Sequence, residues 1–234
     1  FNLRNVRQEH VKLRPAELPA SVIERIKMLT KRVVRAFELK DLGQAEFRVG
    51  TGPKGYEVHF LAVEALPSLN PNMSLSLAAK HQGSDFDGVV KAVIKSACQR
   101  YGRLPHLENT QPRKIKKASM RVGFTFNIKR SEVDEAQAEF DTPKTIQSIA
   151  SAIESYGHSV VHLEATPDLP RRLADAAPDV VFNIAEGIRG RGREAQVPAL
   201  CELLGIPYSG SDSTTQSLCL DKGLTKQILR AAGI

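Results

Sequence analysis

Residues 179–205 read DVVFNIAEGIRGRGREAQVPALCELLG. The apolar run DVVFNI predicts a strand, and REAQVPALCELLG predicts a helix that ends at Gly205. Between them, Gly187, Gly190 and Gly192 would let the backbone come close to a ligand, and the first NH groups of the helix could bind an anion. The stretch has neither a GxGxxG fingerprint nor a Walker-type GKS or GKT. By spacing alone, a ligand-binding loop and a plain surface turn both remain open.

The segments before this stretch continue the same alternation of strands and helices. RVGFTF (121–126) and SVVHL (159–163) predict two further strands. Between them, Thr142 and Pro143 predict a helix start, with an N-cap residue followed by proline in the first turn. This order favours a doubly wound parallel sheet, in which ligands bind past the carboxyl ends of the strands. The loop after DVVF occupies such a position.

The first half of the chain has a different pattern. Apolar residues recur at helical spacing from Ser21 to Phe37. Two strand-like runs follow, AEFRV and YEVHFLAVEAL, separated by the turn sequence TGPKG. SLSLAAKHQG and FDGVVKAVIKSACQRYG then predict two helices. Two antiparallel strands covered by helices make an α+β unit.

Composition narrows the class of protein. Of 234 residues, 41% are hydrophobic and 25% are charged, which is typical of an ordinary globular chain. No apolar run approaches the roughly 20 residues that span a bilayer, and the first residues lack a signal-peptide layout. We therefore expect a cytoplasmic protein without membrane partners. Cys98, Cys201 and Cys219 lie in helix-like patterns without metal-ligand spacing, which predicts buried thiols. The start at Phe1 suggests a segment of a longer polypeptide.

Charge divides the chain into two units. Residues 1–117 carry 21 Lys and Arg against 11 Asp and Glu, a net of +10, whereas residues 118–234 carry 12 against 15, a net of −3. The boundary falls in ENTQPRKIKKASMR, where Pro112 and a cluster of basic residues break every periodicity. We interpret this stretch as a linker rather than a nucleic-acid patch, because no aromatic residues for base stacking lie beside it.

Four stretches of the second unit carry a family resemblance. DVVFNIAEG, REAQVPALCELLG, GIPYSGSD and LCLDKGLTKQILRAAGI occur in the order found in the amino-terminal part of D-alanine:D-alanine ligases, which are ATP-grasp enzymes. The resemblance covers residues 119–234. It implies a Rossmann-like parallel-sheet domain over 119–212 and the start of a second ATP-grasp domain over 213–234.

The resemblance also implies roles for residues in the loops. The family's loop after the third strand begins His-Gly and continues with acidic residues; here Glu186 and Gly187 stand at its start and arginines replace much of the acidic part. These differences from the family predict either a changed substrate preference or no retained substrate preference. The family glutamate that contacts the ammonium of the first D-alanine matches Glu139 by register, with Glu135 and Asp141 as competitors. Alternatively, Glu139 merely flanks the N-cap at Thr142.

The LDK motif carries the nucleotide chemistry that the resemblance implies. The lysine of that motif approaches the phosphates of ATP, where an ammonium offsets growing negative charge. Lys222 occupies this position, and Lys226, one turn later, is a second candidate. Without the surrounding match, both would be interpreted as solvated helix lysines.

The first unit resembles another part of the same family. Residues 15–102 are similar to the carboxy-terminal ATP-grasp lobe, which we expect over 1–110, followed by a linker at 111–118. In the family, carboxylates and an amide of this lobe hold two Mg²⁺ ions, because hard oxygen ligands suit that cation. Ser74 and Leu75 match the Ser-Leu pair that closes over the product in the family.

The metal motif of this lobe has decayed. Alignment on Pro67 puts Glu64 at the asparagine position and Ala62 at the glutamate position, while Glu46 replaces the aspartate and Gln44 the arginine. A methyl group cannot coordinate magnesium. Glu46 and Glu64 could retain one weak metal site, or they are strand carboxylates at the surface. The lobe is therefore predicted to be catalytically degenerate.

The order of the two units is unusual, because a carboxy-terminal lobe precedes an amino-terminal domain. Tandem fusion of two ligase-like units explains it most simply, with circular permutation as the alternative. The resemblance implies an ATP- and Mg²⁺-dependent ligase that joins amino acids for cell-wall precursors, and a possible homodimer. We expect this segment to be inactive alone. A non-catalytic scaffold is the second hypothesis; a dinucleotide-binding module is the third, but NIKRSEVDE offers no glycine fingerprint after RVGFTF.

Overall fold

The computed structural model describes residues 16–53, 55–102 and 119–234 of the chain. The predicted linker at 111–118 lies outside the described residues, as does most of the basic stretch around it. The structure is a mixed α/β arrangement with one small antiparallel sheet and one parallel sheet.

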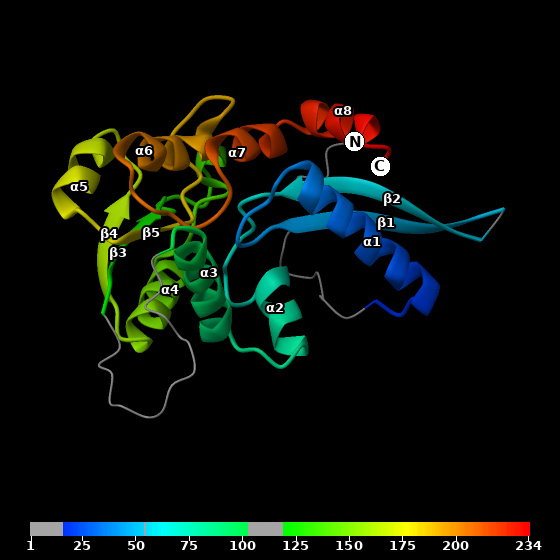
Figure 1. The fold of residues 1–234 in the computed structure, drawn as a ribbon, viewed down its shortest axis with the longest axis horizontal. Coiled ribbons are helices and arrows are strands. Elements are labelled where there is room, and N and C mark those ends of the chain that lie inside the picture. Colours follow the sequence, from blue (N-terminus) through cyan, green and yellow to red (C-terminus); the bar gives the residue numbers. More distant parts are fainter. Residues whose placement is uncertain (1–15, 54, 103–118) are drawn as a thin grey trace.

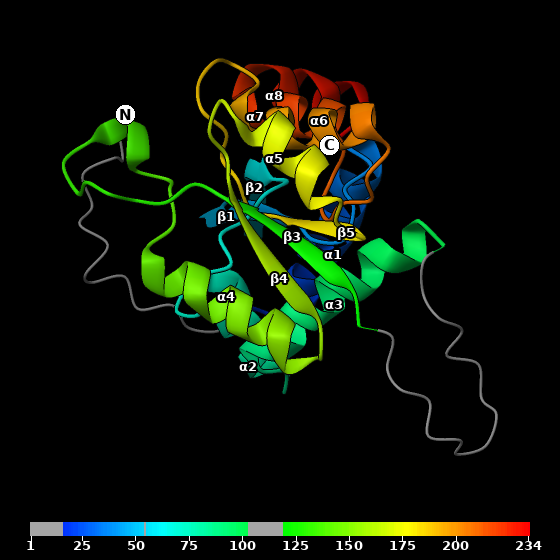
Figure 2. The same ribbon diagram turned by 90° about the vertical axis from the view of Figure 1, so that its left-hand side faces the viewer.

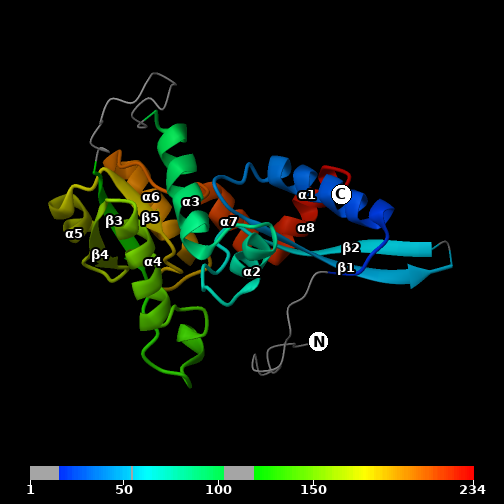
Figure 3. The same ribbon diagram turned by 90° about the horizontal axis from the view of Figure 1, so that it is seen from below.

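The first unit follows the predicted order of helix, two strands and two helices. Its strands β1 and β2 pair antiparallel as a long hairpin that extends away from the rest of the molecule (Figures 1 and 3). Helix α1 lies along this hairpin, whereas α2 and α3 lie nearer to the second unit. The elements are α1 (Ala20–Ala36), β1 (Gln44–Gly52), β2 (Gly55–Glu64), α2 (Ser74–His81) and α3 (Phe86–Arg100).

The second unit contains the predicted parallel sheet, with strand order β4-β3-β5. The helix start predicted at Thr142 is confirmed, because its hydroxyl oxygen accepts a hydrogen bond from the Thr145 NH at 3.2 Å. The elements are β3 (Arg121–Phe126), η2 (Glu135–Gln137), α4 (Pro143–Ser155), β4 (Ser159–Glu164), α5 (Leu169–Ala176), β5 (Val180–Asn183), η3 (Arg193–Ala195), α6 (Gln196–Leu204), α7 (Ser213–Leu220) and α8 (Lys222–Ala231).

Both units cover the parallel sheet. On one face, Val122 and Phe124 of β3 pack in a single core with Ile149 of α4 and with Val90 and Ile94 of α3. On the other face, α5 and α6 close a second core (Figure 2). Among the described residues, this core contains members of the second unit only. A parallel sheet must be buried on both faces. Helix α3 of the first unit therefore completes the layer that α4 begins.

A third core joins the hairpin to the end of the chain. Val33 and Phe37, at the end of α1, and Val63 of β2 pack with Cys219 of α7 and Leu229 of α8. In Figures 1 and 3, α8 lies beside α1 and the hairpin. Two of the three cores in the described part of the chain are therefore shared by both units.

A buried polar contact also connects the units. The Asp41 carboxylate, which is 2% exposed, accepts hydrogen bonds from Arg100 at the end of α3 and from the Gly210 NH, at 2.7 and 2.9 Å. Arg100 in turn donates to the carbonyl of Tyr208. Ser96 donates to the second oxygen of Asp41. This network fixes α3 against the loop that follows α6.

All three cysteines lie in the described ranges and are buried, as the sequence predicts. Burial raises the pKa of the Cys201 and Cys219 thiols to about 12. None of the helices in those ranges is long and apolar enough to cross a membrane.

Candidate functional site

The candidate site lies where the parallel sheet reverses its direction of winding. The chain passes from β3 to β4 on one side and returns to β5 on the other, so the carboxyl ends of β3 and β5 face the same crevice. Ligands of doubly wound sheets bind at this switch point. The loop after β3 carries Glu139 and Asp141, and the loop after β5 carries Glu186.

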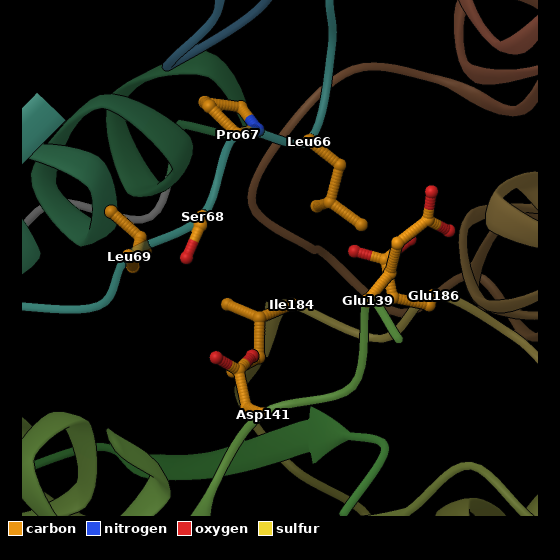
Figure 4. Close-up of a pocket in the computed structure, with 8 residues that line it drawn as sticks. All are labelled: Leu66, Pro67, Ser68, Leu69, Glu139, Asp141, Ile184 and Glu186. Carbon is orange, nitrogen blue, oxygen red and sulfur yellow. The ribbon is translucent and has the colours of Figure 1, made fainter. Parts of the chain in front are cut away.

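The structure brings these three carboxyl groups together around one small pocket of about 20 Å³. This volume holds roughly one water molecule. Figure 4 shows Glu139 and Glu186 side by side, with Asp141 on the far side of Ile184. The remaining wall comes from the first unit, where residues 66–69 follow β2. The pocket is therefore made by both units.

The loop after β5 is folded back on itself by specific contacts. Gly187 has a φ of 79°, and a Cβ atom there would lie 2.0 Å from the carbonyl oxygen of Arg193. The Gly187 NH donates to the side-chain oxygen of Asn127 at 2.9 Å. Gln196 closes the loop from the other end, by accepting from the Ile188 NH and donating to the Arg189 carbonyl. The stretch is an ordered loop built around Gly187.

This loop places the Arg193 guanidinium among three carboxyl groups. Arg193 Nη2 donates a hydrogen bond to Glu139 and lies 3.9 Å from Glu186 and 3.6 Å from Glu194. The side chain of Arg193 is 25% exposed, whereas those of Glu186 and Glu194 are 17% and 12% exposed. A single guanidinium thus lies among several acidic side chains in a partly buried cluster.

Three carboxyl groups at the site, those of Glu186, Glu194 and Asp141, have raised pKa values. Burial, together with the nearby carboxylates of Glu194 and Glu139, raises the pKa of Glu186 to about 9. Burial raises the pKa of Glu194 to about 7, partly offset by Arg193, and that of Asp141 to about 6. Glu186 is therefore a neutral carboxylic acid at pH 7 and can donate a hydrogen bond.

Lys222 is the first residue of α8. Glu64 at the end of β2 has a raised pKa, caused by burial and the neighbouring Glu46 and partly offset by the positive charge of Lys222. Asp221 caps α8 by accepting from the NH groups of Gly223 and Leu224. Lys226 is exposed one turn further along the helix. The structure thus places Lys222 near the strand end that carries Glu64.

Arg191 connects the loop after β5 to this helix start. Its Nε donates to the Asp221 carboxylate at 2.9 Å, and a second guanidinium nitrogen contacts the same oxygen. Asp221 is the residue before Lys222, so this ion pair holds the loop close to the LDK motif.

Gln44, Glu46 and Glu64 lie at the end of the hairpin near the second unit. Gln44 pairs with Glu64 and Glu46 with Ala62 across the two strands, and a register shift follows Glu46. The Gln44 amide accepts from the Ser74 hydroxyl at 2.7 Å and donates to Glu46 at 3.2 Å. Within the described ranges, no group of three or more His, Cys, Asp or Glu side chains is arranged to hold a metal ion.

Three other predicted site residues lie apart from the pocket. Ser74 starts α2, where its hydroxyl binds Gln44, and Leu75 packs against the core that both units share. Glu135, a competitor of Glu139, is an exposed residue of η2 and does not line the pocket. Asp141, the second competitor, does line it.

Sequence reasoning missed Arg193, Glu194 and Asn127. Asn127 follows directly after RVGFTF, and a polar residue at the carboxyl end of a central strand is a usable signal. Arg193 and Glu194 were visible only as part of a charged loop. Their roles depend on which carboxylates the fold brings to them.

The fold and the site define an α/β protein with a carboxylate-rich pocket at the switch point of a parallel sheet. Comparison with known proteins relates it to the D-alanine–D-alanine ligases, with which the chain shares partial homology. It is 38% identical to the D-alanine–D-alanine ligase of Erythrobacter litoralis over 88 residues, which is 38% of this chain and 27% of that enzyme. It is 40% identical to that of Aquifex aeolicus over 92 residues, 39% of this chain and 31% of that enzyme.

The matched region is limited in extent. The alignments cover 27% and 31% of the length of these two curated relatives, so the chain spans less than a third of each. No family model matches the chain, and no solved structure matches it.

Proposed function

We propose that this chain is part of an ATP-dependent carboxylate–amine ligase similar to D-alanine–D-alanine ligase. In such a reaction, ATP phosphorylates the carboxylate of one amino acid, and the amine of a second displaces the phosphate. Catalysis of this type is mainly positioning and electrostatics. The observation that carries the proposal is the pocket at the switch point, where Glu139 and Glu186 meet residues 66–69 of the other unit.

In this proposal the chain is organised as a carboxy-terminal ATP-grasp lobe (1–110), a linker (111–118), a Rossmann-like domain (119–212) and the start of a further ATP-grasp domain (213–234). The first substrate binds at the edge of the pocket, where the Glu139 side chain is 62% exposed, with Glu139 or Asp141 available to its ammonium. The two shared cores support a working association between the lobe and the domain within one chain.

Lys222 is the proposed contact for the phosphates of ATP. Lys222 is the first residue of α8 and is exposed. Its positive charge acts on Glu64 at the end of β2, where it partly offsets the rise in the pKa of that carboxyl group. A lysine ammonium is a compact charge suited to phosphate oxygens.

The hairpin does not fit the two-magnesium cage of the family, and we assign no step to a metal there. Ala62 lies opposite Glu46, and the oxygen of the Gln44 amide is already engaged by Ser74. Two carboxylates, Glu46 and Glu64, are too few for such a cage. This register favours a degenerate lobe, and it is the specific observation behind the second candidate, a non-catalytic scaffold.

Isothermal titration with ATP tests the proposal on the intact polypeptide, in which the ATP-grasp domain that starts at residue 213 is complete. We expect binding that Lys222→Ala weakens about tenfold or more, which corresponds to the loss of one charge-assisted phosphate contact. Lys27→Ala is the control, because Lys27 lies on the exposed face of α1, paired with Glu24. Equal binding by wild type and Lys222→Ala, or no binding by either, would contradict the proposed role of Lys222.

The purified 234-residue chain tests the expectation that this segment alone is inactive. With ATP, Mg²⁺ and D-alanine, we expect no release of phosphate above that of a blank without protein. Steady phosphate release that depends on D-alanine would show that the lobe is not degenerate.

A further inference from the structure

Lys222 follows directly after a carboxylate, and yet that carboxylate does not hold it. Asp221 separates α7 from α8 and caps the start of α8, where its Oδ1 accepts hydrogen bonds from the NH groups of Gly223 and Leu224 at 2.9 and 3.0 Å. Among the residues that the structure describes, no Asp or Glu oxygen lies within 4 Å of the Lys222 ammonium. The proposed phosphate contact therefore stands beside an anion without pairing with it.

The second oxygen of this carboxylate is taken by Arg191, in the loop after β5. The Arg191 Nε donates to Asp221 Oδ2 at 2.9 Å, and its Nη2 donates to the same oxygen. The Asp221 side chain is 18% exposed and that of Arg191 is 79% exposed, so the arginine lies on the solvent side of the carboxylate. Both oxygens of Asp221 are thus engaged, one by the helix and one by the loop.

The charge at the start of α8 depends on Arg191. The NH of Leu224 and the guanidinium of Arg191 lower the pKa of Asp221, so its carboxylate is ionised at neutral pH. Without the arginine, the charges of Asp221 and Lys222 would cancel, and the free Oδ2 would attract the lysine ammonium and repel a phosphate. With it, two cations and one anion leave a net positive charge beside the first NH groups of the helix, which favours phosphate.

We propose that Arg191 is a positioning residue for Lys222: by engaging Asp221, it leaves the lysine ammonium free to contact a phosphate of ATP. This inference rests on the proposed function, because it concerns the proposed contact between Lys222 and ATP. Arg191 acts through Asp221 and does not touch the nucleotide.

Isothermal titration of the intact polypeptide with ATP measures this effect. We expect Arg191→Gln to weaken ATP binding about three- to fivefold, less than Lys222→Ala does, because an exposed ion pair has modest strength. Arg191→Lys keeps a cation that can pair with Asp221, so its affinity should stay within about twofold of wild type. Because the Arg191 side chain is 79% exposed, both variants should fold.

Arg189→Gln is the matched control. It removes the same charge from the same loop, where Arg189 is exposed and forms no ion pair within the described part of the chain. Its affinity for ATP should stay within about twofold of wild type.

A double-mutant cycle separates the proposed role from direct contact with ATP. Asp221→Asn keeps a side-chain oxygen for the helix cap but removes the negative charge. In that background Lys222 has no neighbouring anion to be kept from, so adding Arg191→Gln should change the affinity by less than about twofold. An equal loss with and without the Asp221 charge would overturn the inference, because Arg191 would then act on ATP directly.

The remaining outcomes separate this inference from the proposed function. If Lys222→Ala weakens ATP binding but Arg191→Gln binds ATP as tightly as wild type, the role of Arg191 is wrong and the proposed function stands. The role of Arg191 is also wrong if Arg191→Lys binds ATP no better than Arg191→Gln. If the intact polypeptide does not bind ATP, or if Lys222→Ala leaves binding unchanged, the proposed contact of Lys222 is wrong and the inference falls with it.

Discussion

A single buried carboxyl group determines much of the chemistry of this pocket. Glu186 is 17% exposed, lies beside Glu139 and Glu194, and has a pKa of about 9. Between pH 4.5, the ordinary pKa of a glutamate, and about pH 9, Glu186 keeps its proton in the folded state and loses it in the unfolded state. Stability must therefore fall as pH rises through this window.

Glu186→Gln tests this sign. The amide keeps the shape of the neutral acid and cannot ionise, so the variant should be more stable than wild type at pH 8, by about 1–4 kcal/mol. The difference should vanish near pH 4, where wild type is protonated in both states. Urea denaturation measured across this pH range gives the result.

Glu164→Gln is a control with the opposite sign. The hydrogen bond from Arg130 lowers the pKa of Glu164. The ionised Glu164 therefore stabilises the folded state at neutral pH, and this stabilisation is lost as the pH falls below the ordinary pKa of a glutamate. The variant should therefore be less stable than wild type at pH 7. A Glu186→Gln profile that runs parallel to that of wild type from pH 4 to pH 8 would contradict a buried neutral acid at residue 186.

At the scale of an element, the loop between β5 and α6 is an example of backbone geometry that sets up a site. Gly187 has a positive φ and contacts the backbone of Arg193, whereas Gly190 has a φ of 97° and a Cβ atom added there would meet no atom within 4 Å. Both residues need the left-handed region, but only Gly187 is also enclosed. A comparison of substitutions at Gly187 and Gly190 therefore distinguishes the cost of backbone strain from the cost of a steric clash.

Gly187→Ala and Gly190→Ala should differ in cost. Gly190→Ala forces a non-glycine residue to positive φ, which costs about 1–2 kcal/mol. Gly187→Ala adds a backbone clash that must displace Arg193, so the loss of unfolding free energy should be about 3 kcal/mol or more. Urea denaturation of both variants measures this, and equal losses would show that the loop is not closed on Gly187.

At the scale of the whole molecule, the two sequence units share their interior. Leu69, which follows β2, is 2% exposed and belongs to the core of the parallel sheet. The hairpin and α8 share a further core, and Asp41 fixes α3 to the loop at Gly210. A protein joined at three places should unfold as one cooperative unit.

Leu69→Ala tests this coupling. The substitution should cost about 2–5 kcal/mol and should reduce the hydrogen-exchange protection of β2 and β3 together. Leu203→Ala is the matched control, because Leu203 is 82% exposed on α6, and it should cost less than about 0.5 kcal/mol. Loss of protection in β2 alone would indicate that the lobe unfolds independently of the sheet.

The sequence by itself determined the local elements. RVGFTF, SVVHL and DVVFNI are strands, Thr142 and Pro143 start a helix, and the order of elements predicts a parallel sheet with its site after DVVF. These features depend on residues within a turn or two of each other, so periodicity and capping reveal them. Glu139 and Glu186 were predicted in a different way, through the resemblance to the ligase family and the register of its motifs, and their roles stay predictions.

Only the tertiary structure decided which parts meet. The sequence marked a change in charge between the units, but it did not indicate that α3 would cover the sheet or that residues 66–69 would line the pocket. Nor did it identify Arg193 as the partner of Glu139, 54 residues earlier in the chain. Such pairings depend on burial and on contacts between distant segments, which no local pattern encodes.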